Sequence, residues 1–373
     1  MKVCILSMQR VANFGSLLQS YALKRELEKL GHTVSFLDIE KNEQDYELLY
    51  PDGEPSSQQQ SKLRSVANKL KKLDRYALNR LRIKKMANRQ DALFARFCED
   101  ALGANNEANK QNYDYCVIGS DEVFNCLTKS SWGFTSQLFG NVPQADQVIT
   151  YAASCGATKL NELPPAVAQR ISEVFTTVKA FSVRDENTRA FVAALAQKDI
   201  FLHADPVMIS DFTEEIETTA MPKGVPERYC VVYSYYNRIS DPVEIAQIKA
   251  FCKENDLVPI TVGAPQMWIG NHLALTPMEA LKVLRNAQFI FTDTFHGTIF
   301  SSKYAKAFAV MTRPSNENKL GDLLRRFGLE KHKVTAFGQV DSIQKFTTDP
   351  EALAVPIKEQ REKTLEYLKT MIQ

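Results

Sequence analysis

Apolar and polar residues alternate along the chain in blocks that predict short buried strands separated by helices. Apolar runs of strand length, typical of a parallel sheet, lie at 2–7, 33–39, 114–119, 148–153, 179–183, 200–203, 229–235, 257–262, 289–291 and 307–311. Apolar residues at helical spacing predict helices at about 17–30, 186–196, 243–255, 277–286, 320–327 and 351–372. The pattern is typical of an α/β fold.

The most informative stretch surrounds His296. An apolar run at 289–291 is followed by polar residues at 292–294, and His296 and Gly297 then open a helical pattern. We expect a strand, a tight loop and a helix whose unpaired N-terminal amides favour an anion. In the alternative interpretation, residues 293 and 294 only cap the helix and His296 packs into the core.

Polar residues follow several other predicted strands. In open α/β sheets, ligands bind outside the carboxyl ends of the strands, so these residues are candidates for a shared site. They are Asn13, Gly15, Ser16, Asp121, Glu122, Asn125, Ser154, Arg184, Asp205 and Arg313. Structural alternatives remain open: Ser16 can cap the helix at 17–30, and Arg184 can pair with Asp185.

Length and composition favour a two-domain protein. A chain of 373 residues exceeds one comfortable core, and residues 211–227 change composition in the manner of a linker. We expect Rossmann-like domains at 1–212 and 225–345 that face each other across a cleft, with a helix at 350–373 packing back across the junction. This is the architecture of GT-B-type transferases.

Net charge, cysteine pattern and the length of apolar runs limit the partners and the cellular compartment that we expect. A net charge of +2 gives no indication of nucleic-acid binding. Seven scattered cysteines without a CxxC pair suit a reducing compartment, and no apolar run matches a signal peptide or a membrane span. We therefore expect a soluble cytoplasmic protein. No HxxxH or carboxylate cluster predicts a metal.

A basic helical insertion is expected at about 57–100. Residues 62–89 contain eleven Lys and Arg residues against the single acid Asp74, interleaved with apolar residues. One interpretation is the solvated face of an inserted helical pair. The other is attraction to an anionic partner, either the inner face of the cell membrane or a phosphorylated lipid carrier. Sparse aromatic residues argue against nucleic acid.

With these motifs assembled, the sequence resembles the polysaccharide pyruvyl transferase family. The matching pieces span nearly the whole chain and lie at 13–16, 114–121, 151–156, 182–185, 205–206, 293–297 and 325–329. The resemblance implies a GT-B-like fold, phosphoenolpyruvate as donor and a pyruvate ketal on two hydroxyls of a surface polysaccharide, such as a capsule or exopolysaccharide, or of its lipid-linked precursor. Thr294 stands where many members carry Arg, and His203 stands where we expect an apolar residue.

The expected chemistry assigns roles to the candidate residues. Phosphoenolpyruvate is a small polyanion, so Arg184, Ser154, Gly297, Thr298 and Arg313 are expected to bind the donor. A ketal requires a general acid and a general base, for which we expect His296 and either Asp121 or Glu122. The acceptor is expected at Asn13, Gly15, Ser16 and Asn125. Phosphoenolpyruvate is a co-substrate, and neither a cofactor nor a metal is expected.

Two other functions fit the same pattern. A GT-B-type glycosyltransferase would use a nucleotide sugar, but no convincing Glu that could bind the ribose lies at a strand end in the second half. A binding subunit of an assembly complex would use residues 62–89 to hold its partners and would show no turnover.

Overall fold

The computed structural model describes residues 1–50, 77–127, 130 and 132–373, and its strands form two six-stranded parallel sheets. The N-terminal sheet has the order β2-β1-β3-β4-β5-β6 and consists of β1 (Lys2–Leu6), β2 (Thr33–Leu37), β3 (Tyr113–Asp121), β4 (Ala145–Ala153), β5 (Val178–Val183) and β6 (Ile200–Leu202). The C-terminal sheet has the order β12-β11-β10-β7-β8-β9 and consists of β7 (Tyr229–Tyr233), β8 (Val258–Thr261), β9 (Asn271–His272), β10 (Phe289–Thr292), β11 (Phe308–Met311) and β12 (Lys333–Val334). The predicted fold class, two Rossmann-like domains, is confirmed.

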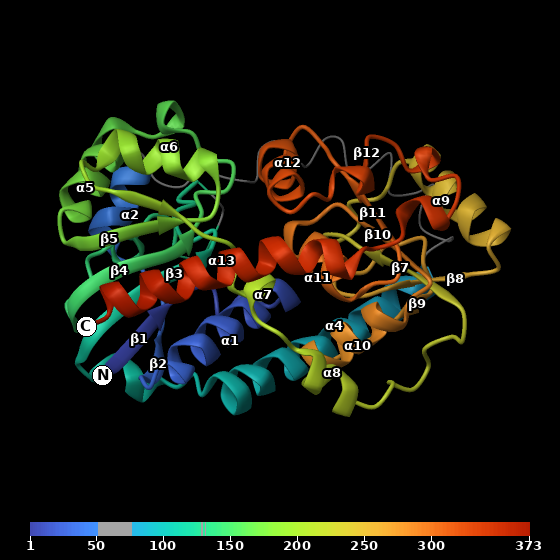
Figure 1. Cartoon of the computed structure of the whole chain (residues 1–373), viewed down its shortest axis with the longest axis horizontal. Helices are drawn as coiled ribbons and strands as arrows, with labels where there is room; N and C mark the ends of the chain where they lie inside the picture. The colour runs from blue at the N-terminus through green and yellow to red at the C-terminus, as the bar shows by residue number, and fades with distance from the viewer. Residues whose placement is uncertain (51–76, 128–129, 131) are drawn as a thin grey trace.

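Helices cover both sheets (Figure 1). Those that follow N-terminal strands are α1 (Phe14–Lys29), α2 (Glu43–Leu49), α5 (Pro165–Phe175), α6 (Glu186–Leu195) and α7 (Pro206–Ile209). Those of the C-terminal half are α9 (Pro242–Glu254), α10 (Pro277–Asn286), α11 (Phe295–Tyr304) and α12 (Glu317–Arg326). A short helix, α8 (Thr213–Thr218), lies within the predicted linker.

The first helix begins three residues earlier than the sequence predicts. Asn13, not Ser16, is its N-cap, and the Asn13 side chain accepts a hydrogen bond from the Ser16 amide at 2.8 Å. Asn is as good an N-cap as Ser, and its carbonyl oxygen satisfies an amide that the first turn leaves unpaired. At the other end, Gly31 takes the left-handed conformation (φ 87°) that the predicted stop requires.

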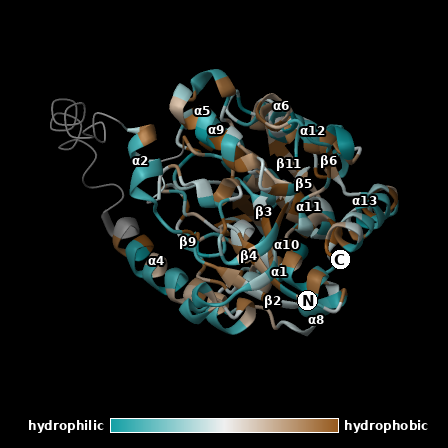
Figure 2. Ribbon diagram, turned by 90° about the vertical axis from the view of Figure 1, so that its left-hand side faces the viewer, coloured by the Kyte–Doolittle hydropathy of each residue, from teal (hydrophilic) through white to brown (hydrophobic). Residues whose placement is uncertain are grey.

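The two domains share apolar core along their junction. Alternate residues of β1 point to opposite faces: Val3 and Ile5 join a large cluster that also includes Val231 and Ile290 of the other sheet, whereas Cys4 packs on the outer side. Apolar segments accordingly gather in the middle of the molecule in Figure 2. Burial of this shared surface stabilises the arrangement of the two domains.

Two long helices connect the domains. Helix α13 (Pro350–Met371) crosses from the C-terminal sheet to the N-terminal one, where the Tyr367 hydroxyl donates to the Thr150 carbonyl at 2.9 Å (Figure 1). The ring of Tyr367 also packs against His203, with centroids 4.8 Å apart, and His203 Nδ1 bonds to the Ser182 hydroxyl. His203, which stands where we expect an apolar residue, therefore lies in the buried contact between α13 and the N-terminal domain.

Helix α4 (Ala77–Phe97) is the described part of the predicted basic insertion, and residues 57–76 lie outside the described residues. Its Gln90 side chain donates to the Leu275 carbonyl (2.7 Å) and accepts from the Leu275 amide (3.0 Å), which ties α4 to the C-terminal domain. Within the described ranges, no helix has the length and hydropathy needed to cross a bilayer.

The sheet topology places two switch points opposite each other. In the N-terminal sheet β1 lies between β2 and β3, and in the C-terminal sheet β7 lies between β8 and β10. Ligands of open α/β sheets bind beyond the carboxyl ends of such strands. The residues after β1, β3, β7 and β10 are therefore the ones that this fold presents to a ligand.

Candidate active site

A cavity of about 670 Å³ lies between the domains, at the carboxyl ends of these strands. The N-terminal domain contributes Asn13, Ser16, Asp121 and Glu122, and the C-terminal domain contributes Ser234, Tyr235, Thr294 and His296. Apolar residues of α4, among them Ile83 and Phe94, form a further wall with Trp132. The cavity therefore has a polar end and an apolar side, as is common for sites that bind organic ligands.

His296 lies in the first turn of α11, as the sequence predicts. Thr294 is the N-cap, and its hydroxyl accepts a hydrogen bond from the Gly297 amide at 3.0 Å. A Cβ at Gly297 would lie 2.2 Å from Thr292 Oγ1, so the turn requires glycine there. The amides of Phe295 and His296 belong to the first turn, where backbone N–H groups have no acceptor within the helix.

The first turns of α1 and α11 meet at Gly15. A Cβ at Gly15 would lie 2.2 Å from His296 Nδ1 and 2.5 Å from its Cγ, closer than real contacts allow. The imidazole therefore packs directly against the backbone of the opposite domain. This contact gives Gly15 a role in the position of His296, and the acceptor contact expected from the sequence stays a prediction.

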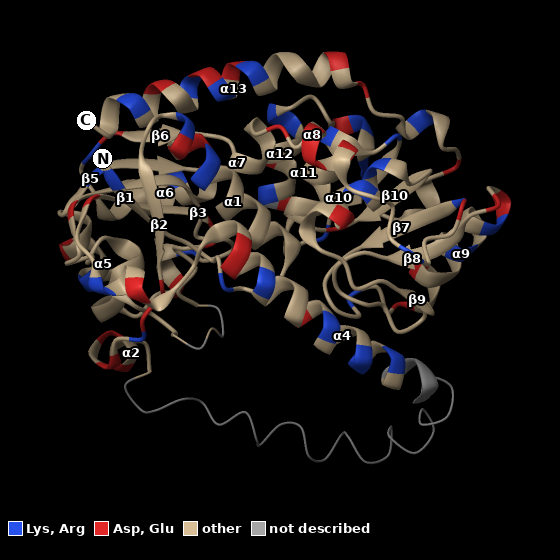
Figure 3. Cartoon of the chain, turned by 90° about the horizontal axis from the view of Figure 1, so that it is seen from below, with Lys and Arg blue, Asp and Glu red and all other residues tan. Residues whose placement is uncertain are grey.

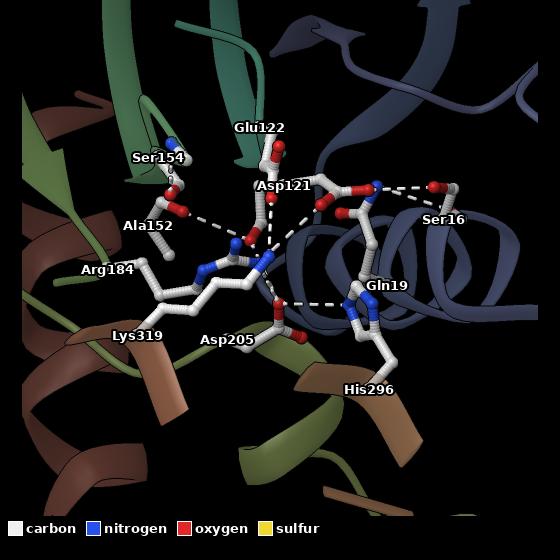
Figure 4. Close-up of polar contacts among 12 residues, drawn as sticks. Ser16, Gln19, Asp121, Glu122, Ala152, Ser154, Arg184, Asp205, His296 and Lys319 are labelled. Carbon is white, nitrogen blue, oxygen red and sulfur yellow. Dashed lines mark hydrogen bonds and ion pairs between the residues drawn. The ribbon is translucent and has the colours of Figure 1, made fainter. Parts of the chain in front are cut away.

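Asp205, Arg184 and His296 form a buried polar network across the domain junction (Figure 4). Asp205 Oδ2 lies 3.0 Å from Arg184 Nη1 and 3.4 Å from His296 Nε2. The side chain of Asp205 is fully buried and that of Arg184 is 3% exposed. The Arg184 guanidinium also lies 4.0 Å from the centre of the Phe295 ring. Asp205 thus holds two residues that the sequence places in the site.

In this network, Asp205 and Arg184 each favour the ionised form of the other. Burial opposes ionisation of Asp205, but His296 and Arg184 outweigh it and lower the pKa of the carboxyl to about 2. Burial alone would likewise lower the pKa of Arg184, but Asp205 and Asp121 raise it above its ordinary value. Asp121 Oδ1 lies 3.7 Å from Arg184 Nη1. Asp205 is therefore a carboxylate at neutral pH.

Asp121 and Glu122 both face the cavity but have different partners. Asp121 Oδ2 accepts a hydrogen bond from the Ser16 hydroxyl at 2.7 Å. Glu122 pairs with Lys319 of α12, 2.9 Å away, and accepts from the Asn125 amide at 2.7 Å. Burial would raise the pKa of Glu122, but Lys319 and Asn125 lower it to about 2. Asn125 thus supports Glu122 and is not part of the cavity wall.

Four residues expected to bind the donor have other partners. Ser154 is buried and donates to Asp185 at 2.8 Å. The amides of Gly297 and Thr298 are both bonded to Thr294, so neither is free for a ligand. Arg313 lies outside the cavity wall and binds two carboxylates: its Nε donates to Asp293 at 2.9 Å, and both Nη atoms donate to Glu244. The cap at Thr294 is the local alternative that the sequence offers, whereas the partners of Ser154 and Arg313 are tertiary contacts that local sequence does not reveal.

The structure identifies Asp205 and Lys319 as further candidates for functional residues. Asp205 was one of several polar residues at strand ends, and only its contacts with Arg184 and His296 distinguish it. Lys319 had no sequence signal, because it lies in a helix of the other domain, 197 residues from its partner Glu122. The described part of the chain contains no group of three or more His, Cys, Asp or Glu that could hold a metal ion. The absence of a metal requirement stays a prediction.

Two Rossmann-like domains with a polar site between them define the GT-B class of fold. The chain belongs to the polysaccharide pyruvyl transferase family, whose sequence model matches residues 13–315. Membership supports a transferase that acts in the pyruvylation of polysaccharides.

Comparison with solved structures returns matches at low identity and with TM-scores below 0.5. S. aureus MnaA with UDP is 9% identical (100% of this chain, 98% of the other, TM-score 0.47). The UDP-GlcNAc 2-epimerase from Methanocaldococcus jannaschii is 10% identical (97% and 93%, TM-score 0.43). The spinosyn rhamnosyltransferase SpnG with thymidine diphosphate is 11% identical (100% and 96%, TM-score 0.35). No match was found among curated proteins.

Proposed function

We propose that this protein transfers the pyruvyl group of phosphoenolpyruvate onto two hydroxyls of one sugar and forms a pyruvate ketal. The sugar belongs to a surface polysaccharide or its lipid-linked precursor, and phosphate is released. The proposal is supported by family membership and, above all, by the network of Arg184, Asp205 and His296 that meets at the polar end of the cavity.

The proton balance defines what the site must do. The methylene carbon of phosphoenolpyruvate gains a proton, one sugar hydroxyl attacks C2, the C2–O bond to phosphate breaks, and the second hydroxyl attacks C2. The two hydroxyl protons end on the new methyl group and on the released phosphate. The site therefore needs one group that gives up a proton and takes it back, and a base near the hydroxyls.

His296 is suited to the first role because its imidazole lines the cavity while Asp205 lies behind it. The contact with the buried Asp205 carboxylate fixes the orientation of the imidazole. As an imidazolium, His296 can protonate the methylene carbon or the leaving phosphate. Asp205 is then a positioning residue, which also holds Arg184 at the same place.

Asp121 is the better of the two candidate bases. A general base works best when its pKa lies near the pH of the reaction, and the pKa of Glu122 is about 2. Asp121 is paired less closely, with 3.7 Å between Oδ1 and Arg184, and shares a hydrogen bond with Ser16. We assign the acceptor hydroxyls to the region of Asn13, Ser16 and Asp121.

Helix α4 suits an acceptor that is carried on a lipid. Its buried residues Ile83 and Phe94 line the cavity, whereas Arg82, Lys85 and Arg89 are exposed. Lys and Arg residues recur along α4 in Figure 3. A basic helix attracts an anionic membrane surface at about 1 kcal/mol for each Lys or Arg near it. We propose that α4 holds the enzyme at the inner face of the cell membrane, next to its substrate.

This placement predicts charge-dependent binding to vesicles. The double variant Lys85→Glu/Arg89→Glu should lose at least tenfold in affinity for phosphatidylglycerol vesicles in co-sedimentation. The matched control, Lys358→Glu/Lys369→Glu on the exposed side of α13, should bind as wild type does. Equal binding by both double variants would remove α4 from the membrane contact.

Turnover separates the proposed reaction from its rivals. The protein should be incubated with phosphoenolpyruvate and a panel of lipid-linked oligosaccharides, followed by mass spectrometry of the acceptor and assay of phosphate. We expect a gain of one pyruvyl group with one phosphate released. Release of a nucleoside diphosphate from a nucleotide sugar would instead identify a glycosyltransferase, and saturable acceptor binding without turnover would identify a binding subunit.

A further inference from the structure

The ion pair between Glu122 and Lys319 joins the two domains at the polar end of the cavity. Glu122 follows β3 of the N-terminal domain, Lys319 lies on α12 of the C-terminal domain, and the atoms are 2.9 Å apart. Glu122 lines the main cavity, whereas Lys319 lines a second hollow of about 500 Å³ beside the start of α6. The pair therefore stands between two solvent-accessible spaces, and either partner can be reached by a ligand.

Two cations converge at this point from different elements. Lys319 and Arg184 approach the carboxylates of Asp121, Glu122 and Asp205 from the same side (Figure 4). Each cation lowers the pKa of Glu122, with Lys319 the stronger. The Nε atom of Arg184 is buried and has no hydrogen-bond partner among the described residues. Buried donors without partners are costly, so this cation still has capacity for an acceptor.

The three carboxylates differ in how easily each can move. Asp205 is fully buried, and the side chain of Asp121 is 14% exposed and hydrogen-bonded to Ser16. Glu122 is 28% exposed and has one more rotatable bond than an aspartate. Of the three, Glu122 is the most exposed and the most flexible, and leaving its position breaks its contacts with Lys319 and Asn125.

We propose that Lys319 is an anion-binding residue of the donor site, and that the Glu122 carboxylate occupies the anion's position until the donor displaces it. The inference rests on the proposed function and extends it. A donor with both a phosphate and a carboxylate brings several negative charges, which would be repelled by a fixed Glu122. When Glu122 swings away, the donor anion replaces it as the charge partner of the Lys319 ammonium, and Arg184 lies beside the same anion.

Displacement of Glu122 by the donor predicts opposite effects on donor affinity for substitutions at Lys319 and at Glu122. Lys319→Met should weaken binding of phosphoenolpyruvate, measured by isothermal titration calorimetry, at least tenfold, while Lys319→Arg should retain part of the affinity. Glu122→Gln should bind more tightly than wild type, because the competing carboxylate is gone while the side chain keeps its size. Lys345→Met removes a lysine that is paired with Asp341 on the surface, and it should bind as wild type does.

Inorganic phosphate as a second titrant separates this inference from the proposed function. If wild type binds phosphate in a Lys319-dependent manner but does not bind phosphoenolpyruvate, the anion site stands and the proposed function fails. If wild type turns over phosphoenolpyruvate and folded Lys319→Met binds it within twofold of wild type, the inference is overturned and the function stands. Weaker binding by Glu122→Gln than by wild type would overturn the displacement. Binding of neither titrant by wild type would overturn both.

Discussion

Gly15→Ala tests whether the contact between the two domains positions His296. The added Cβ would lie 2.2 Å from Nδ1, 2.5 Å from Cγ and 2.8 Å from Cβ of His296. These atoms belong to the base of the side chain and its ring, so the histidine cannot avoid the methyl group by a small movement of a flexible end. Either the imidazole rotates away from Asp205 or the two helix starts separate.

We expect Gly15→Ala to lower the free energy of unfolding slightly and the rate of pyruvyl transfer strongly. Overpacking costs about 1–3 kcal/mol, and alanine in place of glycine in a helix returns up to about 1 kcal/mol. The free energy of unfolding should therefore fall by no more than about 3 kcal/mol. A misplacement of about 1 Å in a catalytic group costs roughly 100-fold in rate. We therefore expect kcat/KM for pyruvyl transfer to fall about 100-fold while the protein stays folded.

The assay is phosphate release under initial-rate conditions, with circular dichroism and urea unfolding as controls. Gly270→Ala is the matched substitution, because a Cβ at Gly270 would meet no atom within 4 Å, and it should leave both quantities unchanged. A folded Gly15→Ala enzyme that keeps kcat/KM within threefold of wild type would refute the argument that this contact positions His296.

Two further predictions concern the buried network. Arg184→Ala leaves the carboxylates of Asp205 and Asp121 without their shared cation, so the free energy of unfolding measured in urea should fall by about 3–5 kcal/mol, in contrast to the smaller loss for Gly15→Ala. The pKa of Asp205 is about 2, against the usual 3.8, so its ionised form is favoured in the folded state. The Asp205 charge therefore stabilises the fold above pH 4 by about 2 kcal/mol. This contribution is lost as the pH falls toward 2. Asp205→Asn should accordingly lose less stability than wild type between pH 4 and pH 2, and equal slopes would contradict the assignment.

Local pattern was sufficient to predict the alternation of strands and helices. Residues 289–304 form the expected strand, loop and helix, because an apolar run followed by residues at helical spacing has few other buried arrangements. Helix α5 (Pro165–Phe175) was missed although Val167, Ile171 and Val174 recur at helical spacing. The strands β9 and β12, of two residues each, carry no pattern that could predict them.

The site depends on contacts that no local pattern encodes. Thr294 was identified as a departure from the family's arginine, and in the structure it caps the helix of His296. Lys319, which has no local sequence signal, is placed beside Glu122 only by the packing of α12 against the other domain. The Arg313 guanidinium could bind an anion, but it is already paired with the carboxylates of Glu244 and Asp293.

The central claim is that His296, held between the domains, moves the proton that pyruvyl transfer requires. The most direct measurement is the rate at which a His296→Asn enzyme adds pyruvyl groups to the acceptor, relative to wild type, with folding verified for both. General acid–base catalysis contributes about 10²–10⁴-fold, so we predict a loss of at least 100-fold. A folded variant that keeps more than a tenth of the wild-type rate, a difference of only about 1.4 kcal/mol, would contradict the claim.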